Sequence, residues 1–266
     1  MSTASQFSLA VQDLLVAARS AYLWSMLGWQ DIKQRYRRST LGPLWLTVSS
    51  AVMIVALGAV YAAIFKMNLH DYFPFLAVGL VVWSLLSSIV TDGCQVFIVN
   101  EAMIKQVRLP FFVHVLRMVW RNLIIFAHNF IIVVLVLAYF RIVPTPGQLL
   151  AFAAGLGLTL VNAAWLGMVL GCLCARFRDI PLIVTSLVQL LFFLTPVIWH
   201  PGLMPGRHRV VDWNPIYHFI EVVRAPLLGQ WPAPHSWAAV LLITLIGWMF
   251  TTAWLTRYRR RIAYWL

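Results

Sequence analysis

Charge is what this sequence has least of. Asp, Glu, Lys and Arg make up 11% of its 266 residues, and 8 of these side chains are acidic against 20 basic ones. Soluble domains average about 25% charged residues, and disordered chains combine high charge with few aromatic rings. With 62% hydrophobic and 14% aromatic residues, the chain is neither an ordinary soluble domain nor a disordered one.

Cysteine is also rare, with three residues, which is too few for a disulfide framework. Cys172 and Cys174 stand together at the end of an apolar run, without a histidine or carboxylate close enough in sequence to complete a metal site. We interpret both as small residues of a membrane helix and expect no metal.

A nucleotide-binding motif is missing as well. The three lysines are Lys33, Lys66 and Lys105, and none follows a glycine, so the sequence has no Gly-Lys-Ser/Thr phosphate loop. No catalytic triad or metal motif of recognised spacing occurs either. We therefore expect no cofactor in this chain, and any ATP and magnesium to be bound by a partner.

Long uncharged stretches are the strongest positive signal. Six of them exceed 18 residues, and about 20 mostly apolar residues suffice to cross the hydrocarbon core of a bilayer. Because lipid cannot pair with backbone polar groups, these stretches predict an all-α integral membrane protein. The expected transmembrane helices are 42–65, 73–92, 119–140, 149–174, 180–199 and 237–255, within one transmembrane domain, 1–266.

Basic residues are distributed unevenly between the two sides of these spans. Fifteen of the 20 Lys and Arg fall on the side that holds both termini, and five fall on the other. Since positive residues favour the cytoplasmic side, both termini are expected in the cytoplasm. The basic excess is then a device that orients the chain, and we expect no nucleic acid partner.

Ionisable residues are lacking deep within the predicted spans. His128 is the sole histidine inside one, and a lone histidine usually makes a helix contact. Transporters driven by protons or ions usually carry buried acids or histidines as relays. The sequence therefore disfavours a secondary transporter.

Two cytoplasmic segments have helical patterns. Residues 8–38 are amphipathic in part, with Trp29, Ile32 and Tyr36 on one face, which predicts a helix that lies in the membrane interface as a functional element or as a simple anchor. Residues 100–110 predict one or two helical turns ending before Pro110. That short helix either docks a partner or merely connects two spans.

The largest outer segment, 200–236, contains a further helical pattern. Asn214 is a suitable N-cap, Pro215 suits the first helical position, and Gly229 closes the element. Glu221 and Arg224 are spaced to pair on the side opposite the apolar face. Pro196 predicts that the fifth span ends in a bent or re-entrant segment.

The first and fifth spans carry uncharged polar and aromatic side chains. Such a mixture suits sugars, which stack on rings and form neutral hydrogen bonds, but it also occurs in ordinary helix packing. From the residues alone both interpretations remain open. The side chains concerned include Trp45, Ser49, Tyr61, Gln189, Phe193 and Thr195.

Several segments, in this order, resemble one known family along nearly the whole chain. They are Asp31–Trp45, Asn100–Pro110, Arg176–Ile180, Phe192–Val197, Asn214–Glu221 and the basic tail Arg257–Arg261. The sequence resembles the membrane permease subunit of ATP-binding-cassette polysaccharide exporters, the type-2 group that moves O-antigens, capsules and teichoic acids.

The resemblance implies a homodimer with two separate ATPase chains docked on its cytoplasmic face. It implies a gate helix before the first span, about Trp29–Arg38, joined to that span by Leu41 and Gly42. Within this site of Arg35, Tyr36, Arg37, Arg38, Leu41 and Gly42, we expect the three arginines to hold a lipid pyrophosphate. The resemblance implies a coupling helix that docks the ATPase through Asn100, Glu101, Lys105, Arg108 and Pro110, and a periplasmic gate within 200–236. It also implies a channel lined by the first and fifth spans, with Trp45, Ser49, Tyr61, Gln189, Phe193 and Thr195.

We therefore expect a non-enzymatic permease in a bacterial inner membrane that exports a lipid-linked (polyprenyl pyrophosphate) polysaccharide, most simply an O-antigen. One alternative is an ATP-driven exporter of a small lipid or drug. Two others are a membrane-embedded glycosyl- or acyltransferase and a scaffold for a polysaccharide synthase.

Overall fold

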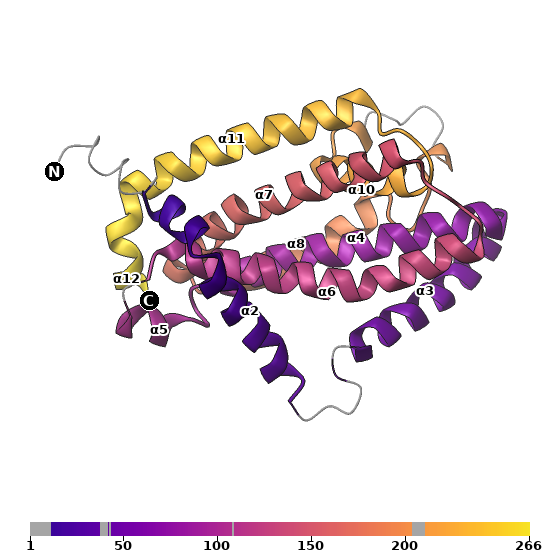
Figure 1. The fold of residues 1–266 in the computed structure, drawn as a ribbon. Helices are drawn as coiled ribbons and strands as arrows, with labels where there is room; N and C mark the ends of the chain where they lie inside the picture. Colours follow the sequence, from indigo (N-terminus) through magenta and orange to yellow (C-terminus); the bar gives the residue numbers. More distant parts are fainter. Residues whose placement is uncertain (1–11, 38–41, 43, 108, 204–210) are drawn as a thin grey trace.

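The computed structural model describes residues 12–37, 42, 44–107, 109–203 and 211–266. Residues 12–19 are helical, and the elements after them are again helices, arranged as an elongated bundle (Figure 1). They are α2 (Ala21–Arg35), α3 (Leu44–Phe65), α4 (Leu69–Gln95), α5 (Glu101–Gln106), α6 (Phe111–Tyr139), α7 (Pro146–Arg176), α8 (Ile180–Leu194), α10 (Pro215–Leu227), α11 (Pro234–Tyr258) and α12 (Ile262–Trp265), with short 3-10 turns at Pro201–Leu203 and Arg259–Arg261.

The two ends of the bundle carry different elements. The start of α2, the short α5 and α12 gather at one end, which we call the α5 end (Figure 1). The turn from α3 to α4 and the connection from α6 to α7 lie at the opposite end. The long helices run between the two ends, as expected of a protein that crosses a bilayer several times.

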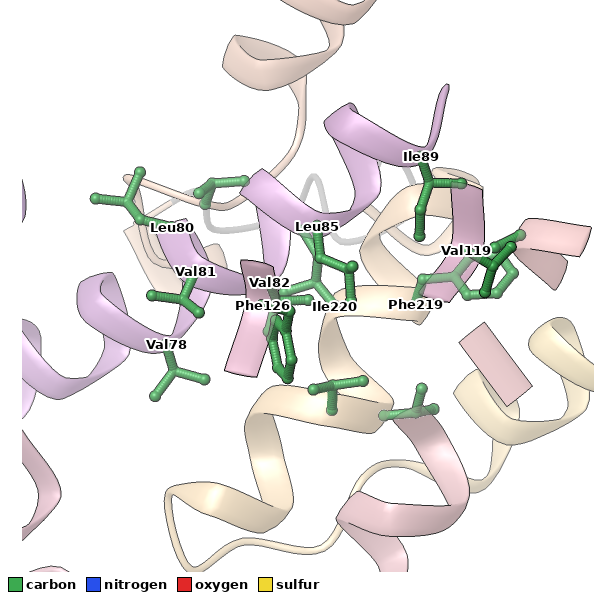
Figure 2. Close-up of a cluster of buried hydrophobic side chains, with 14 of the residues drawn as sticks. Val78, Leu80, Val81, Val82, Leu85, Ile89, Val119, Phe126, Phe219 and Ile220 are labelled. Atoms are coloured by element: carbon green, nitrogen blue, oxygen red, sulfur yellow. The ribbon is translucent and has the colours of Figure 1, made fainter. Parts of the chain in front are cut away.

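Helix α4 is the centre of the bundle. It packs against α3, α6, α7, α8 and α10, and a continuous stretch from Pro74 to Val82 is buried. Its apolar residues meet side chains of α6 and α10, among them Val119, Phe126 and Ile220 (Figure 2). Because lipid is as apolar as these side chains, close packing rather than the hydrophobic effect selects this arrangement.

Glycines allow α4 and α7 to approach each other. A Cβ atom on Gly93 would lie 3.2 Å from the Cα atom of Gly167, and one on Gly171 would lie 2.5 Å from a Val96 methyl group. The spacing of four residues between Gly167 and Gly171 places both on one face of α7, which permits this close contact with α4.

The number of spans differs from the predicted six. Among the described residues, five helices are long and apolar enough to cross a membrane: α3, α4, α6, α7 and α11. The predicted span 180–199 is instead the 15-residue α8, about 22 Å long at 1.5 Å per residue. It ends at Leu194 because Pro196 lacks a backbone N–H and forces Thr195 into an extended conformation.

The chain beyond α8 turns back into the bundle, as its prolines predicted. Val197 is fully buried, and the Tyr72 hydroxyl of α4 donates to the Ile198 carbonyl at 2.6 Å. A Cβ atom on Gly79 would lie 3.1 Å from the Val197 carbonyl oxygen, so this glycine lets the returning segment lie against α4. We call residues 195–200 the returning segment.

Helix α10 begins as predicted, but one of its side chains lies elsewhere. The Asn214 side chain accepts a hydrogen bond from the Ile216 N–H at 3.0 Å, and Gly229 has a φ of 75° just beyond the helix. Arg224 and Glu221 pair at 3.0 Å as expected, yet the Arg224 side chain is 3% exposed rather than on an open face. It points inward because its guanidinium donates to the Pro196 carbonyl, at 2.9 Å, where α8 has already ended.

Candidate functional site

A network of charged side chains joins three helices near the α5 end. Arg117 of α6 donates from Nε to Oδ2 of Asp31 in α2, at 2.8 Å, and from Nη2 to the other oxygen of that carboxylate. Its Nη1 donates to the Asn100 side chain at 2.9 Å. Because Asn100 is the N-cap residue of α5, Arg117 contacts both α2 and the start of α5.

The network continues into α4. Arg121 donates to Asp92 at 2.8 Å and lies 3.4 Å from Asp31, while the Asn122 amide donates to Asp92 at 2.9 Å. The charged side chains are 14–26% exposed, so water only partly screens their attraction. Bidentate pairing of this kind has a defined geometry, so it fixes the position of α2 relative to α6.

Local sequence explains how the network forms. Arg117 and Arg121 are four residues apart and therefore lie on one face of α6. A Cβ atom on Gly28 would lie 3.1 Å from the Arg117 carbonyl oxygen, so this glycine brings α2 close enough for Asp31 to reach. The rings of Trp24 and Trp120 meet edge to face at 5.8 Å beside it.

The sequence did not reveal this network. Its pattern predicted no partner for Asp31, and the third span was expected to begin at 119. The structure starts α6 at Phe111, which puts Arg117 inside the helix, and it turns Asp31 toward it. A signal for the network was present in the sequence. Arg117 and Arg121 are four residues apart near the start of a span, where their charges need acidic partners, and Asp31 and Asp92 could supply them.

Helix α5 projects from the bundle. None of its six residues is buried, and the valines that flank it, Val99 and Val107, are 73% and 50% exposed. Lys105 donates to Glu101 at 2.6 Å, which lowers the pKa of the Glu101 carboxyl and keeps it ionised, and Arg178 approaches the same carboxylate at 3.6 Å. The predicted segment 100–110 is thus an exposed helix with paired charges and apolar neighbours, whereas Pro110 caps α6 and Arg108 lies outside the described residues.

The predicted gate residues divide between two environments. Arg35 and Arg37 are exposed, whereas Tyr36 turns inward and lines a small cavity with Ile32 and residues of α3 and α6. Gly42 has a φ of 55°, a conformation that favours glycine. Arg38 and Leu41 lie outside the described part of the chain, as do Ser39, Thr40 and Pro43.

An apolar groove of about 540 Å³ lies between α3, α4 and α8. Gln189 and Phe193 of α8 line it, opposite Met53 of α3. In its wall the ring centres of Trp83 and Phe192 lie 5.3 Å apart. Helix α8 has no buried residue, and the 22 residues of α3 bury three. These two helices therefore present most of their side chains outward from the chain.

The other predicted channel residues lie in different places. Trp45 and Ser49 are exposed on α3, about two turns and one turn before Met53 in the same row, and Trp45 is 57% exposed. Tyr61 is half-buried and stacks on Phe65 at 5.6 Å. Thr195 is fully buried, and its hydroxyl accepts from the Asn214 amide at 2.9 Å, so it joins the end of α8 to the start of α10 instead of facing the groove.

Metal-ligating side chains do not cluster in the part of the chain that the structure describes: no group of three or more His, Cys, Asp or Glu could hold an ion there. The arrangement offers three surfaces instead. They are an exposed helix joined to a charged network, an exposed pair of arginines, and an apolar groove with aromatic and amide side chains.

Comparison with known proteins adds a family. The family model described as "ABC-2 type transporter" matches residues 22–228. This range runs from the beginning of α2 to the end of α10, so it includes the charged network, α5, the groove and the returning segment.

Three individual relatives share 22–28% identity with this chain. Two Klebsiella pneumoniae proteins named O-antigen export system permease protein RfbA are 24% and 22% identical, over 72% and 87% of this chain and 74% and 88% of their own lengths. A Myxococcus xanthus protein of the same name is 28% identical over 64% of this chain and 65% of its own length.

Proposed function

Because this chain belongs to the ABC-2 type transporter family and is a permease subunit rather than an enzyme, we propose that it exports a lipid-linked polysaccharide, specifically an O-antigen. The observation that carries the substrate is the shared name of three relatives, each an O-antigen export system permease. Their identity of 22–28% supports the transporter class more firmly than the cargo. The family implies an ATPase partner, which agrees with the missing phosphate loop.

The exposed faces of α3 and α8 support a homodimer. Packed against a second copy, they would form a continuous wall from Trp45 and Ser49 of α3 to Gln189 and Phe193 of α8. Rings and amides in such a wall contact sugars by stacking and by neutral hydrogen bonds. Thr195 has no role in this wall, because it is buried.

Helix α5 is proposed as the ATPase-docking element. Ile104 packs against the core, while the exposed side chains of Ala102, Lys105 and Gln106 remain for a partner, and the exposed Val99 and Val107 supply apolar contact beside the Glu101–Lys105 pair. When the ATPases bind ATP and close, displacement of α5 would reach α2 through Asn100 and Arg117. The chain would be oriented in the inner membrane with α5 and both termini on the cytoplasmic side, which the distribution of Lys and Arg supports.

The export function is tested by deleting the gene in its native host. We expect surface O-antigen to disappear and lipid-linked glycan to accumulate inside, with recovery only when the permease and an ATPase are both supplied. The purified complex should contain two copies of each chain. Normal surface glycan in the deletion strain, with increased sensitivity to drugs or a change in lipid composition, would favour the small-molecule exporter instead.

Charge reversal in α5 tests the docking assignment. Lys105→Glu places two like charges four residues apart and presents the ATPase with the wrong sign, so we expect a several-fold loss of export. Lys66→Glu is the matched control, because Lys66 is an exposed lysine in the turn between α3 and α4. Equal export by the two variants, together with unchanged recovery of ATPase by co-purification, would remove α5 from the docking surface.

Three arginines, the last residue of α2 and two that follow it in the sequence, are proposed to hold the pyrophosphate of the lipid carrier. Replacing Arg35, Arg37 and Arg38 by Gln should lower export at least about tenfold, because each hydrogen bond to a charged group contributes about 1.5–3 kcal/mol. The assembled complex should still hydrolyse ATP. Arg257→Gln with Arg261→Gln, which removes two other exposed arginines, is the control, and unchanged export by the triple variant would count against a pyrophosphate site.

A further inference from the structure

A second pocket lies at the end of the bundle opposite α5 and has no role in the function proposed above. Its volume is about 510 Å³, within the range of small-molecule sites. It is formed by the start of α4, the returning segment and α10. Six of its polar side chains are His70, Asp71, His200, Tyr217, Glu221 and Gln230.

The base of this pocket is a neutralised ion pair. Arg224 pairs with Glu221 at 3.0 Å, donates to the Pro196 carbonyl at 2.9 Å and lies 3.9 Å from the centre of the Phe75 ring. Its charge is therefore already balanced and its side chain is held in place. Such a base is rigid before any ligand arrives, which lowers the entropic cost of binding.

Two further side chains are neutral near pH 7. Burial raises the pKa of Tyr217 to about 12, with nearby Glu221 adding to the rise. Burial, followed by the charge of Arg224, lowers the pKa of His200. The His200 Nδ1 accepts from the Gly202 N–H at 3.2 Å, so the neutral ring carries its proton on Nε2 and can donate into the pocket.

Other ligand classes fit this lining less well. An anion would meet the carboxylates of Asp71 and Glu221, while Arg224 is already engaged. A hydrocarbon chain would cover polar groups of this lining, such as the Tyr217 hydroxyl and the Gln230 amide, without offering them hydrogen bonds. A metal ion would need three closely placed ligands, which do not occur among the described residues.

The pocket also lies next to the groove between α3 and α8. The Trp199 indole donates to the Phe193 carbonyl at 3.1 Å, so the residue before His200 is tied to a residue that lines the groove. A chain that leaves the groove past Phe193 would reach the pocket across the returning segment. We propose that this pocket binds uncharged sugar units of the exported glycan at the outer end of the channel, an inference that rests on the proposed export function.

Binding is tested with the purified permease–ATPase complex in lipid nanodiscs. The probe is a set of short oligosaccharides released from the host's own surface polysaccharide and freed of lipid, with binding measured by calorimetry. Tyr217→Phe and His200→Gln each remove or alter one polar group and should each raise the Kd about tenfold or more, the cost of a lost hydrogen bond in a site built for hydroxyls. Tyr139→Phe and His235→Gln, at exposed residues outside the pocket, are the matched controls and should leave the Kd unchanged.

The outcomes separate the pocket from the export function. If the wild-type complex restores export in cells but no probe binds, or if neither pocket variant weakens binding, the pocket assignment is wrong and the export function stands. If inorganic phosphate binds with the same sensitivity to Tyr217→Phe, the sugar assignment is wrong. If the deletion strain exports normally, the export function fails and this inference fails with it, whatever the probe shows.

Discussion

Reversing the charge of Asp31 is expected to stop export almost completely. Asp31→Arg would place a third cation against Arg117 and Arg121 and break the bidentate contact that ties α2 to α6. Removing one partner of a buried pair costs about 3–5 kcal/mol, and the 14–19% exposure of these side chains reduces that cost. Because Arg117 also holds Asn100, the start of α5 would lose its fixed position relative to α2.

A reciprocal variant separates geometry from charge. Asp31→Arg combined with Arg117→Asp restores opposite charges between α2 and α6, and we expect partial recovery of export. Recovery should be incomplete because Arg121 still faces position 31. The measurements are surface glycan, the thermal midpoint of the purified complex and the ATP hydrolysed per glycan exported.

A second ion pair provides the matched control. Arg259 donates to both carboxylate oxygens of Asp13, at 2.6 and 2.7 Å, so this pair ties the first described helical residues to the end of α11. Asp13→Arg should lower the thermal midpoint to a comparable degree while leaving the ratio of ATP to glycan unchanged. If Asp31→Arg changes that ratio no more than Asp13→Arg does, the network only stabilises the fold and does not link α5 to α2.

Gly155→Ala is expected to destabilise the packing of α10 against α7. A Cβ atom at this position of α7 would lie 2.5 Å from the Val222 carbonyl oxygen and 3.0 Å from the Val222 carbonyl carbon in α10. Both are backbone atoms within helices, so α10 would have to move away from α7. Overpacking of this kind costs about 1–3 kcal/mol, and a shift of α10 would also disturb Arg224 and the returning segment.

The same helix supplies a control of opposite sign. Gly157 lies two residues after Gly155 in α7, and a Cβ atom there would meet no atom within 4 Å. Gly157→Ala removes backbone freedom without a clash and should stabilise the helix by about 0.5–1 kcal/mol. Unfolding in detergent, followed by circular dichroism, compares the two variants; equal midpoints would mean that α7 and α10 are not packed as closely as the structure shows.

The length of a helix was harder to predict from sequence than its position. Uncharged runs located each of the long helices, because lipid tolerates few charges. They also predicted a span over 180–199, yet α8 ends at Leu194 and the returning segment follows it. Hydropathy does not distinguish a helix that continues from an apolar segment that turns back, since both are buried from water.

The ends of α10 were predicted more accurately than the end of α8, because helix caps depend on a few neighbouring residues. The Asn214 cap, the start at Pro215 and the left-handed Gly229 are confirmed, since each depends on a few neighbouring residues. The Glu221–Arg224 pair was predicted for the same reason. Its burial was not, because it depends on the Pro196 carbonyl, 28 residues earlier in the chain.

By itself, the sequence predicted an all-α membrane protein, because the length of an apolar run is a property of the chain read in order; the permease class followed from the resemblance of several segments to a known family. The tertiary structure alone decided which polar groups meet. Asp31, Asp92 and Arg117 come from three separate helices, and His200 and Tyr217 line one pocket because the segment that carries His200 turns back into the bundle. Such contacts depend on how helices pack and on where glycines let them approach, and periodicity along one chain does not contain that information.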